Sequence, residues 1–249
     1  MTVASHRRLW STVACRCQGR PIHLHRERSG TMTRIRTTGA CLIATFAISA
    51  AVATSASAAL PEFNAPFPKP FSSTSKTSIL ETVGKTKVKC TADTNTGEVT
   101  GPSGGILTIR LTGCESKKFS CASPGAAPGE IVTHPLIAML GYVSRVPKEV
   151  GLDLSNPAGA LLAEFQCGNL LATIKGSAIG LITPINKLLV PPKHFALKFV
   201  QKSGIQKILN FAGGSPDFLE TSLNGGPFEQ TGLASTDLIS FGVPAEIKA

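Results

Sequence analysis

The part of the chain after residue 58 has few of the residue types that many functional classes require. It contains no tryptophan, one tyrosine (Tyr142), two histidines (His134 and His194) and two arginines (Arg110 and Arg145). With 17 basic against 14 acidic residues and so little arginine, it lacks the basic footprint of a nucleic-acid partner. The shortage of tryptophan and tyrosine also disfavours a carbohydrate site, because such sites usually expose flat aromatic rings.

Close cysteine pairs of the kind that ligate metals are also missing from this part. Its four cysteines are Cys90, Cys114, Cys121 and Cys167. No CxxC spacing occurs among them, so we expect two disulfides and neither a metal site nor a cofactor. Four cysteines allow three pairings. We favour Cys114–Cys121, which closes a hairpin-like loop, and Cys90–Cys167, which joins distant strands.

No apolar run is long enough to span a bilayer. The longest, Ala40 to Thr54, has about 15 residues where about 20 are needed. It follows Met32, Arg34 and Arg36 and precedes small residues that end at Ala58. This order is typical of a secretory signal peptide. We therefore predict a signal helix over 32–58 with cleavage near Ala58, a secreted or cell-envelope protein, and only transient membrane contact.

Residues 1–31 have no apolar periodicity and are rich in arginine and histidine. We predict a disordered segment upstream of the true start at Met32. A metal cluster is the alternative function for this segment, since four potential ligands fall within it: Cys15, Cys17, His23 and His25.

Residues 59–78 have the composition of a linker. Four prolines disfavour a helix or a central strand, and a Ser/Thr run follows them. We predict an extended Pro/Ser-rich linker whose phenylalanines dock on the domain surface, and a folded domain over 79–249.

The domain alternates apolar and polar residues with period two, which indicates half-buried strands. Clear examples are 87–90, 107–112, 161–167 and 194–201. Turn residues separate such runs, at 95–97, 103–105, 213–214 and 224–226. Helical turns are expected only at 146–150 and 205–211. The predicted fold is all-β, a single antiparallel β-barrel or a two-sheet β-sandwich closed by two disulfides.

Two motifs have a structural interpretation that we prefer to the catalytic or metal-binding one. The segment 101–105, GPSGG, matches the G-x-S-x-G nucleophile elbow, but a strand follows it instead of the required helix. The segment 93–98, DTNTGE, begins like a calcium loop but has glycines where the third ligand and the closing glutamate should lie. We interpret both as turns.

Catalytic residues are not assigned. A hydrolase remains an alternative if His134 or His194 lies beside a serine such as Ser177 and a carboxylate. Paired carboxylates for glycoside hydrolysis would come from scattered acids such as Glu130, Glu164 and Asp153. A third possibility is a barrel that holds a small apolar ligand. It requires an enclosed cavity lined by four residues: Phe165, Phe195, Leu197 and Phe199.

The order of several short blocks resembles a known group of proteins. These blocks are LTGC (111–114), FSCAS (119–123), GEIVTHPL (129–136), LGYV (140–143), EFQCG (164–168), GSAIGLITPIN (176–186) and ETSLNGGPFEQ (220–230). Together with the ASAALPEF junction at 56–63, they are similar to secreted all-β proteins of unknown function from Solirubrobacter-like actinobacteria. The resemblance implies secretion from an actinobacterium and carries over no catalytic residue. The signal segment, the cysteine arrangement and the lack of a catalytic constellation lead us to expect a non-enzymatic binding or structural role with an unidentified extracellular or envelope ligand.

Overall fold

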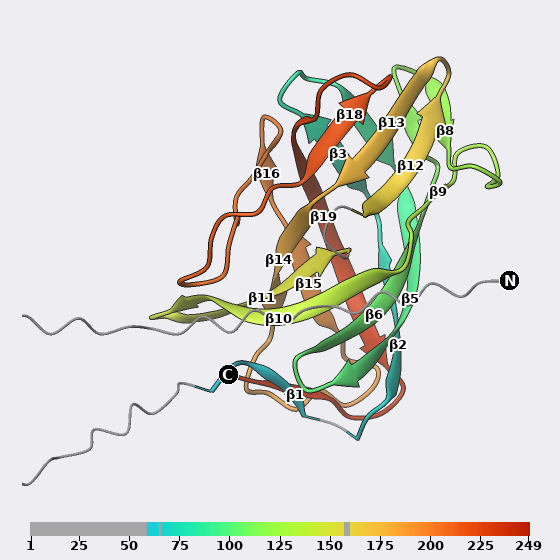
Figure 1. The fold of residues 1–249 in the computed structure, drawn as a ribbon. Coiled ribbons are helices and arrows are strands. Elements are labelled where there is room, and N and C mark those ends of the chain that lie inside the picture. The colour runs from blue at the N-terminus through green and yellow to red at the C-terminus, as the bar shows by residue number, and fades with distance from the viewer. Residues whose placement is uncertain (1–58, 65, 157–159) are drawn as a thin grey trace, which may run out of the picture. The chain divides into compact units, whose positions relative to one another are not determined.

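The computed structural model describes residues 59–64, 66–156 and 160–249. The predictions for 1–31, for the metal ligands Cys15, Cys17, His23 and His25, and for the signal peptide over 32–58 lie outside these residues. Every regular element in the described ranges is a β-strand, which confirms the all-β class (Figure 1). No helix within them is long and apolar enough to cross a membrane.

Eight antiparallel strands close into a barrel, which we call the main barrel. Each strand pairs with the next one around the barrel, and the last pairs with the first: β2 (Lys69–Ser75), β5 (Ala92–Gly101), β6 (Gly104–Thr112), β10 (Leu136–Arg145), β11 (Lys148–Ser155), β14 (Ser177–Thr183), β15 (Phe195–Phe199) and β19 (Glu229–Phe241). Of the two predicted architectures, the barrel is therefore confirmed and the sandwich is wrong.

A second closed circuit of strands, which we call the disulfide ring, lies at one end of the main barrel (Figure 1). Its strands, again in pairing order, are β3 (Ser78–Thr82), β4 (Lys87–Cys90), β7 (Glu115–Ser116), β8 (Phe119–Ala122), β12 (Leu161–Cys167), β13 (Leu170–Lys175), β18 (Glu220–Leu223) and the first part of β19. β19 is long enough to belong to both circuits, so the two share one strand.

Four further connections between the circuits are breaks of only one or two residues. They separate β2 from β3, β4 from β5, β6 from β7 and β13 from β14. The last break is Gly176 alone, with φ of +92°. A Cβ atom there would lie 1.8 Å from the carbonyl oxygen of Phe218, so only glycine fits this corner.

The other end of the main barrel is closed by a two-stranded sheet of β1 (Glu62–Asn64) and β20 (Glu246–Lys248). Ile247 is fully buried there, and Phe63 packs edge-on against Phe241, which also contacts Phe71 and Phe195. The remaining strands are short: β9 (Ile131–Val132) pairs with β6, and β16 (Gln201–Lys202) forms a hairpin with β17 (Ile205–Gln206).

Three local predictions from the sequence are wrong. Residues 59–78 are not a linker: they contain β1, all of the barrel strand β2 and the start of β3, and Phe63 is buried rather than docked on a surface. The helical turns expected at 146–150 and 205–211 are replaced by the start of β11 and by β17. The turn expected at 95–97 lies inside β5. In the first and third cases tertiary pairing overrides the local preference of proline, glycine or asparagine.

The alternation of buried and exposed residues is confirmed in the strands where it was clearest. Val88 and Cys90 are buried between exposed lysines. On β15, Phe195, Leu197 and Phe199 are buried while Lys198 is exposed. The period-two pattern therefore identifies the barrel interior correctly for the apolar residues.

Two disulfides form, as the cysteine count predicts, but neither of the two favoured pairs is among them. The bonds are Cys90–Cys114 and Cys121–Cys167, so the favoured pairing of Cys114 with Cys121 and of Cys90 with Cys167 is wrong. The physical reason is strand register. Cys121 lies directly opposite Cys167 on β8 and β12, and Cys90 and Cys114 adjoin the paired residues Lys89 and Glu115. Two disulfides indicate an oxidising environment.

Candidate binding cavity

The described residues line a cavity of about 130 Å³ where the main barrel meets the disulfide ring. Its lining comes from both circuits and is mostly apolar, with Leu152 and Leu154 from β11, Phe165 from β12 and Ile174 from β13. Barrel interiors of eight strands are either filled by side chains or leave room for one small ligand. This interior has only a small void, of about 20 Å³, at the β1–β20 end, and its main cavity lies at the junction of the circuits.

One wall of the cavity is polar. It carries two aspartates, Asp93 on β5 and Asp237 on β19, which are 4% and 7% exposed. Both are register partners of Ser75 on the strand between them, β2, so they lie at the same level of the barrel. The adjoining lining residues of this wall are Ser73, Ser78, Asn95 and Ser235.

The carboxylates are held by hydroxyl and amide donors. The Ser75 and Ser78 hydroxyls donate to Oδ2 of Asp93, the latter at 3.4 Å, and the Ser235 hydroxyl donates to Oδ2 of Asp237 at 3.0 Å. The Asn95 amide nitrogen lies 3.0 Å from Oδ1 of Asp93 and 3.5 Å from Oδ1 of Asp237. One amide therefore bridges the two acids.

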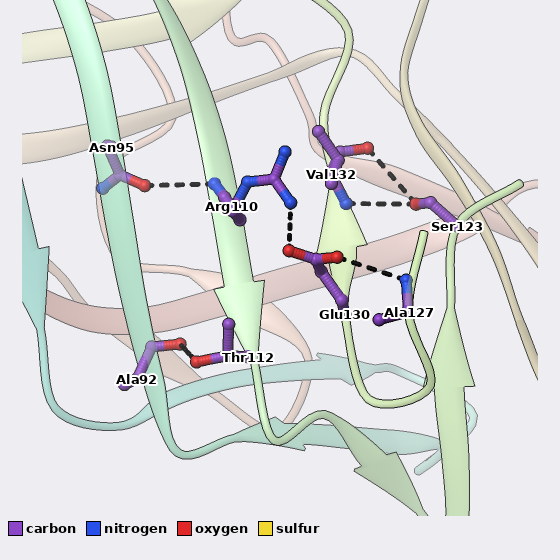
Figure 2. A network of polar contacts seen from close by, with 8 residues as sticks. All are labelled: Ala92, Asn95, Arg110, Thr112, Ser123, Ala127, Glu130 and Val132. Carbon is purple, nitrogen blue, oxygen red and sulfur yellow. Dashed lines mark hydrogen bonds and ion pairs between the residues drawn. The ribbon is translucent and has the colours of Figure 1, made fainter. Parts of the chain in front are cut away.

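The orientation of the Asn95 amide is fixed by its other end (Figure 2). Its oxygen accepts a hydrogen bond of 3.3 Å from the backbone N–H of Arg110 on β6, which directs the amide nitrogen toward the aspartates. The Arg110 side chain leaves the barrel and pairs with Glu130, whose other oxygen accepts from the Ala127 amide. The guanidinium thus fastens an outer loop and does not neutralise the buried acids.

Burial raises the pKa of Asp237 to about 7, and the neighbouring Asp93 carboxylate contributes to this rise through its charge and a hydrogen bond between the two groups. The Ser235 and Asn95 donors oppose this effect because they stabilise the ionised form. Among the described residues no ion pair involves Asp93 or Asp237. Asp237 therefore keeps a proton up to about pH 7, and no cationic side chain of the described residues neutralises this wall of the cavity.

Three of the four residues predicted for an apolar cavity line it: Phe165, Leu197 and Phe199. The fourth, Phe195, lies in the aromatic cluster at the β1–β20 end of the barrel. The sequence argument thus identifies the apolar wall.

The candidate hydrolase residues are not brought together in the described part of the chain. His194 shares a hydrogen bond of 2.8 Å with Ser240 on the exposed surface, without a carboxylate. His134 is exposed at a separate shallow pocket. Ser177 stabilises the ionised form of Asp153, whose pKa is raised to about 6 mainly by burial, but no histidine joins this pair.

The remaining motifs have structural roles. In the segment 101–105, Gly104 and Gly105 are strand residues of β6 packed so closely on neighbouring backbone that a Cβ would lie within 2.0 Å of a carbonyl oxygen. The segment 93–98 is the middle of β5, not a turn or a calcium loop. Glu130 pairs with Arg110, Glu164 lies on β12, and Asp153 faces outward between two cavity-lining leucines. No group of three or more potential metal ligands was found among the described residues.

Sequence reasoning missed the polar wall. The sequence predicts a turn around Asp93 and Asn95, and no motif singles out Asp237. The signal that could have identified these residues is the same period-two alternation that identifies the apolar strands, since Asp93 and Asn95 alternate, as do Ser235 and Asp237. Polar residues in such a pattern are ordinarily assigned to the solvent face.

Comparisons of the chain with protein-family models, with curated proteins and with solved structures found no match.

Proposed function

We propose that this chain is an extracellular or envelope binding protein whose barrel holds one small, mostly apolar molecule at the junction of its two circuits. The observation that carries the proposal is the mostly apolar cavity of about 130 Å³, lined by residues of both circuits. An engineered apolar cavity of about 150 Å³ in another protein takes up benzene. The size therefore favours a compact molecule of about six to eight non-hydrogen atoms.

Export supports the same proposal. The two disulfides fit an oxidising compartment, and the segment 32–58 has the pattern of a cleavable signal. We propose cleavage near Ala58, a site that leaves β1 and β2 in the mature chain. The Solirubrobacter-like resemblance belongs with this proposal as a statement about origin and not about ligand.

A purely structural barrel is the competing interpretation. Interiors are normally packed to the density of organic crystals, with few voids larger than a water molecule. A void of this size also removes packing contacts from its lining and therefore lowers stability. A bound ligand restores those contacts, and a structural role gives no reason to keep the space open.

The test is calorimetric titration of the full chain with benzene, toluene, ethylbenzene and propylbenzene. We expect binding of the smaller members, a loss of affinity at the size where the cavity is filled, and a higher melting temperature with ligand. Ala178→Leu fills the cavity from β14, where Ala178 is 4% exposed, and should abolish binding. Ala127→Leu, an added side chain at an exposed loop position, is the matched control. Failure of every member to bind, or equal binding by the Ala178→Leu variant, would overturn the proposal.

A further inference from the structure

We propose that the ligand is a primary amine with a compact apolar body, bound with its ammonium group on the Asp93–Asp237 wall and its body against the apolar wall. This inference rests on the proposed function and adds the chemical class of the ligand. It is carried by the placement of two buried carboxylates on one side of a mostly apolar cavity.

The geometry of the wall suits an ammonium group. Asp93 and Asp237 come from strands on either side of β2 and face the same cavity, and the single nitrogen of Asn95 lies within hydrogen-bond range of one oxygen of each. A nitrogen that donates several hydrogen bonds can therefore reach both acids from the cavity side. An ammonium group has three donors and no acceptor, whereas a hydroxyl has one donor.

The charge of the wall has no compensation from the described residues. The other polar side chains around the pair are neutral: Ser75 on β2, Ser78 on β3, Asn95 on β5 and Ser235 on β19. Cationic side chains on the adjoining strands point elsewhere, because Arg110 on β6 pairs with Glu130 outside the barrel and Lys198 on β15 is exposed. Within the described ranges, no lysine, arginine or histidine lines the cavity. An isolated buried charge has a high desolvation cost. A cation that enters the cavity therefore interacts more strongly with the carboxylates than it would in water.

The raised pKa of Asp237 supports the same ligand class. Without a ligand, burial and the Asp93 charge keep a proton on Asp237 up to about pH 7. An alkyl ammonium group has a pKa close to that of lysine, roughly 10, and stays charged across this range. When the amine binds as the ammonium ion it takes the place of the Asp237 proton, which passes to the solvent. Binding should therefore strengthen as pH rises and should release a proton near neutral pH.

The experiment compares three molecules of equal size, benzylamine, benzyl alcohol and ethylbenzene, by titration calorimetry of the full chain between pH 5 and pH 8. We expect benzylamine to bind at least tenfold more tightly than ethylbenzene at pH 8, and this advantage to shrink several-fold at pH 5. Titrations in two buffers of different ionisation enthalpy should show proton release at pH 6–7. If benzyl alcohol or ethylbenzene binds as tightly as benzylamine, the ligand class is wrong while the binding cavity stands. If none of the three binds, both proposals fail.

Variants locate the effect. Asp93→Asn and Asp237→Asn each remove one charge at nearly constant shape, and each should weaken benzylamine binding at pH 8 about tenfold or more while leaving ethylbenzene binding unchanged. Asp153→Asn is the matched control, because Asp153 is a partly buried carboxylate on the outer side of β11 and does not line the cavity. Retained ethylbenzene binding shows that a variant is folded. Unchanged benzylamine affinity in both cavity variants would overturn the inference.

Discussion

The main barrel and the disulfide ring are both closed circuits of eight strands that share β19, yet they are closed by different means. In the main barrel, β5 and β6 pair over nine register positions and β10 and β11 over eight. In the disulfide ring, β4 pairs with β7 at one position, and β7–β8 and β8–β12 pair at two each. Both disulfides lie in this weakly paired sector: Cys90–Cys114 beside β4–β7 and Cys121–Cys167 across β8–β12.

The comparison shows where this fold needs covalent bonds. A ladder of one or two pairs contributes few hydrogen bonds, each with a modest net effect of about 1 kcal/mol. A disulfide across the same strands limits the freedom of the unfolded chain instead. The cavity lies where the two circuits meet. Its lining comes partly from the main barrel, which long hydrogen-bonded ladders close, and partly from the disulfide ring.

Removal of the disulfides has the largest expected effect. It tests most directly whether the disulfide ring depends on covalent bonds and the main barrel does not. By the chain-entropy relation, the bonds contribute up to about 4 kcal/mol for Cys121–Cys167 and about 3.5 kcal/mol for Cys90–Cys114, which span 46 and 24 residues. We expect Cys→Ala substitution of both pairs to lower the free energy of unfolding by several kcal/mol, as measured in urea. Hydrogen exchange should accelerate in β4, β7, β8 and β12 well before the main barrel. Equal acceleration of hydrogen exchange in both circuits would show that they open as one cooperative unit, and would contradict the idea that only the ring depends on the disulfides.

The corner at Gly176 tests whether the circuits must meet at a fixed angle. Gly176→Ala introduces a Cβ at positive φ and 1.8 Å from the Phe218 carbonyl oxygen, so we expect a loss of about 3 kcal/mol or more. Gly213→Ala is the matched control, since Gly213 has φ of +88° and no atom near its Cβ position. It should cost about 1 kcal/mol. Similar losses for the two variants in urea unfolding would mean that the close packing at the corner is not required.

The alternation of buried residues and the cysteine count account for the parts of this fold that could be predicted from the sequence. Alternation in 87–90 and 194–201 places Val88, Cys90, Phe195, Leu197 and Phe199 inside, and the cysteine count indicates two disulfides. Prediction failed where long-range pairing decides. Disulfide partners follow from the register of β8 with β12 and of β4 with β7, which no local pattern encodes. The segment 59–78 has the composition of a linker because its prolines are poor strand formers, although β2 pairs with β5 and β19.

Half of the candidate site could be predicted. The apolar wall is indicated by Phe165, Leu197 and Phe199. The polar wall was missed, because Asp93 and Asp237 contradict the rule that polar residues of a strand face solvent. Such exceptions between local pattern and fold are expected at functional sites.

The last prediction concerns Asp237, the residue of the polar wall that lies on the shared strand β19. The pKa of Asp237 is about 7 when folded against an ordinary value of 3.8, so between pH 4 and pH 7 the folded state binds more protons than the unfolded state. Stability from this group is complete below about pH 4 and is lost as pH rises through 7. Asp237→Asn removes this loss, and we expect the variant to be more stable than the wild type at pH 8, with little difference at pH 4.

Urea unfolding of both proteins from pH 4 to pH 8 measures this difference, and Asp153→Asn provides a control whose pH window should end near pH 6. A constant difference between wild type and Asp237→Asn at all pH values would mean that the carboxyl is not held protonated by the fold.

The expected result has a further consequence, because the substitution that stabilises the empty barrel is the one that should weaken benzylamine binding. A residue that lowers stability when no ligand is present, and recovers it when an ammonium ion binds, is typical of a site retained for binding and not for folding.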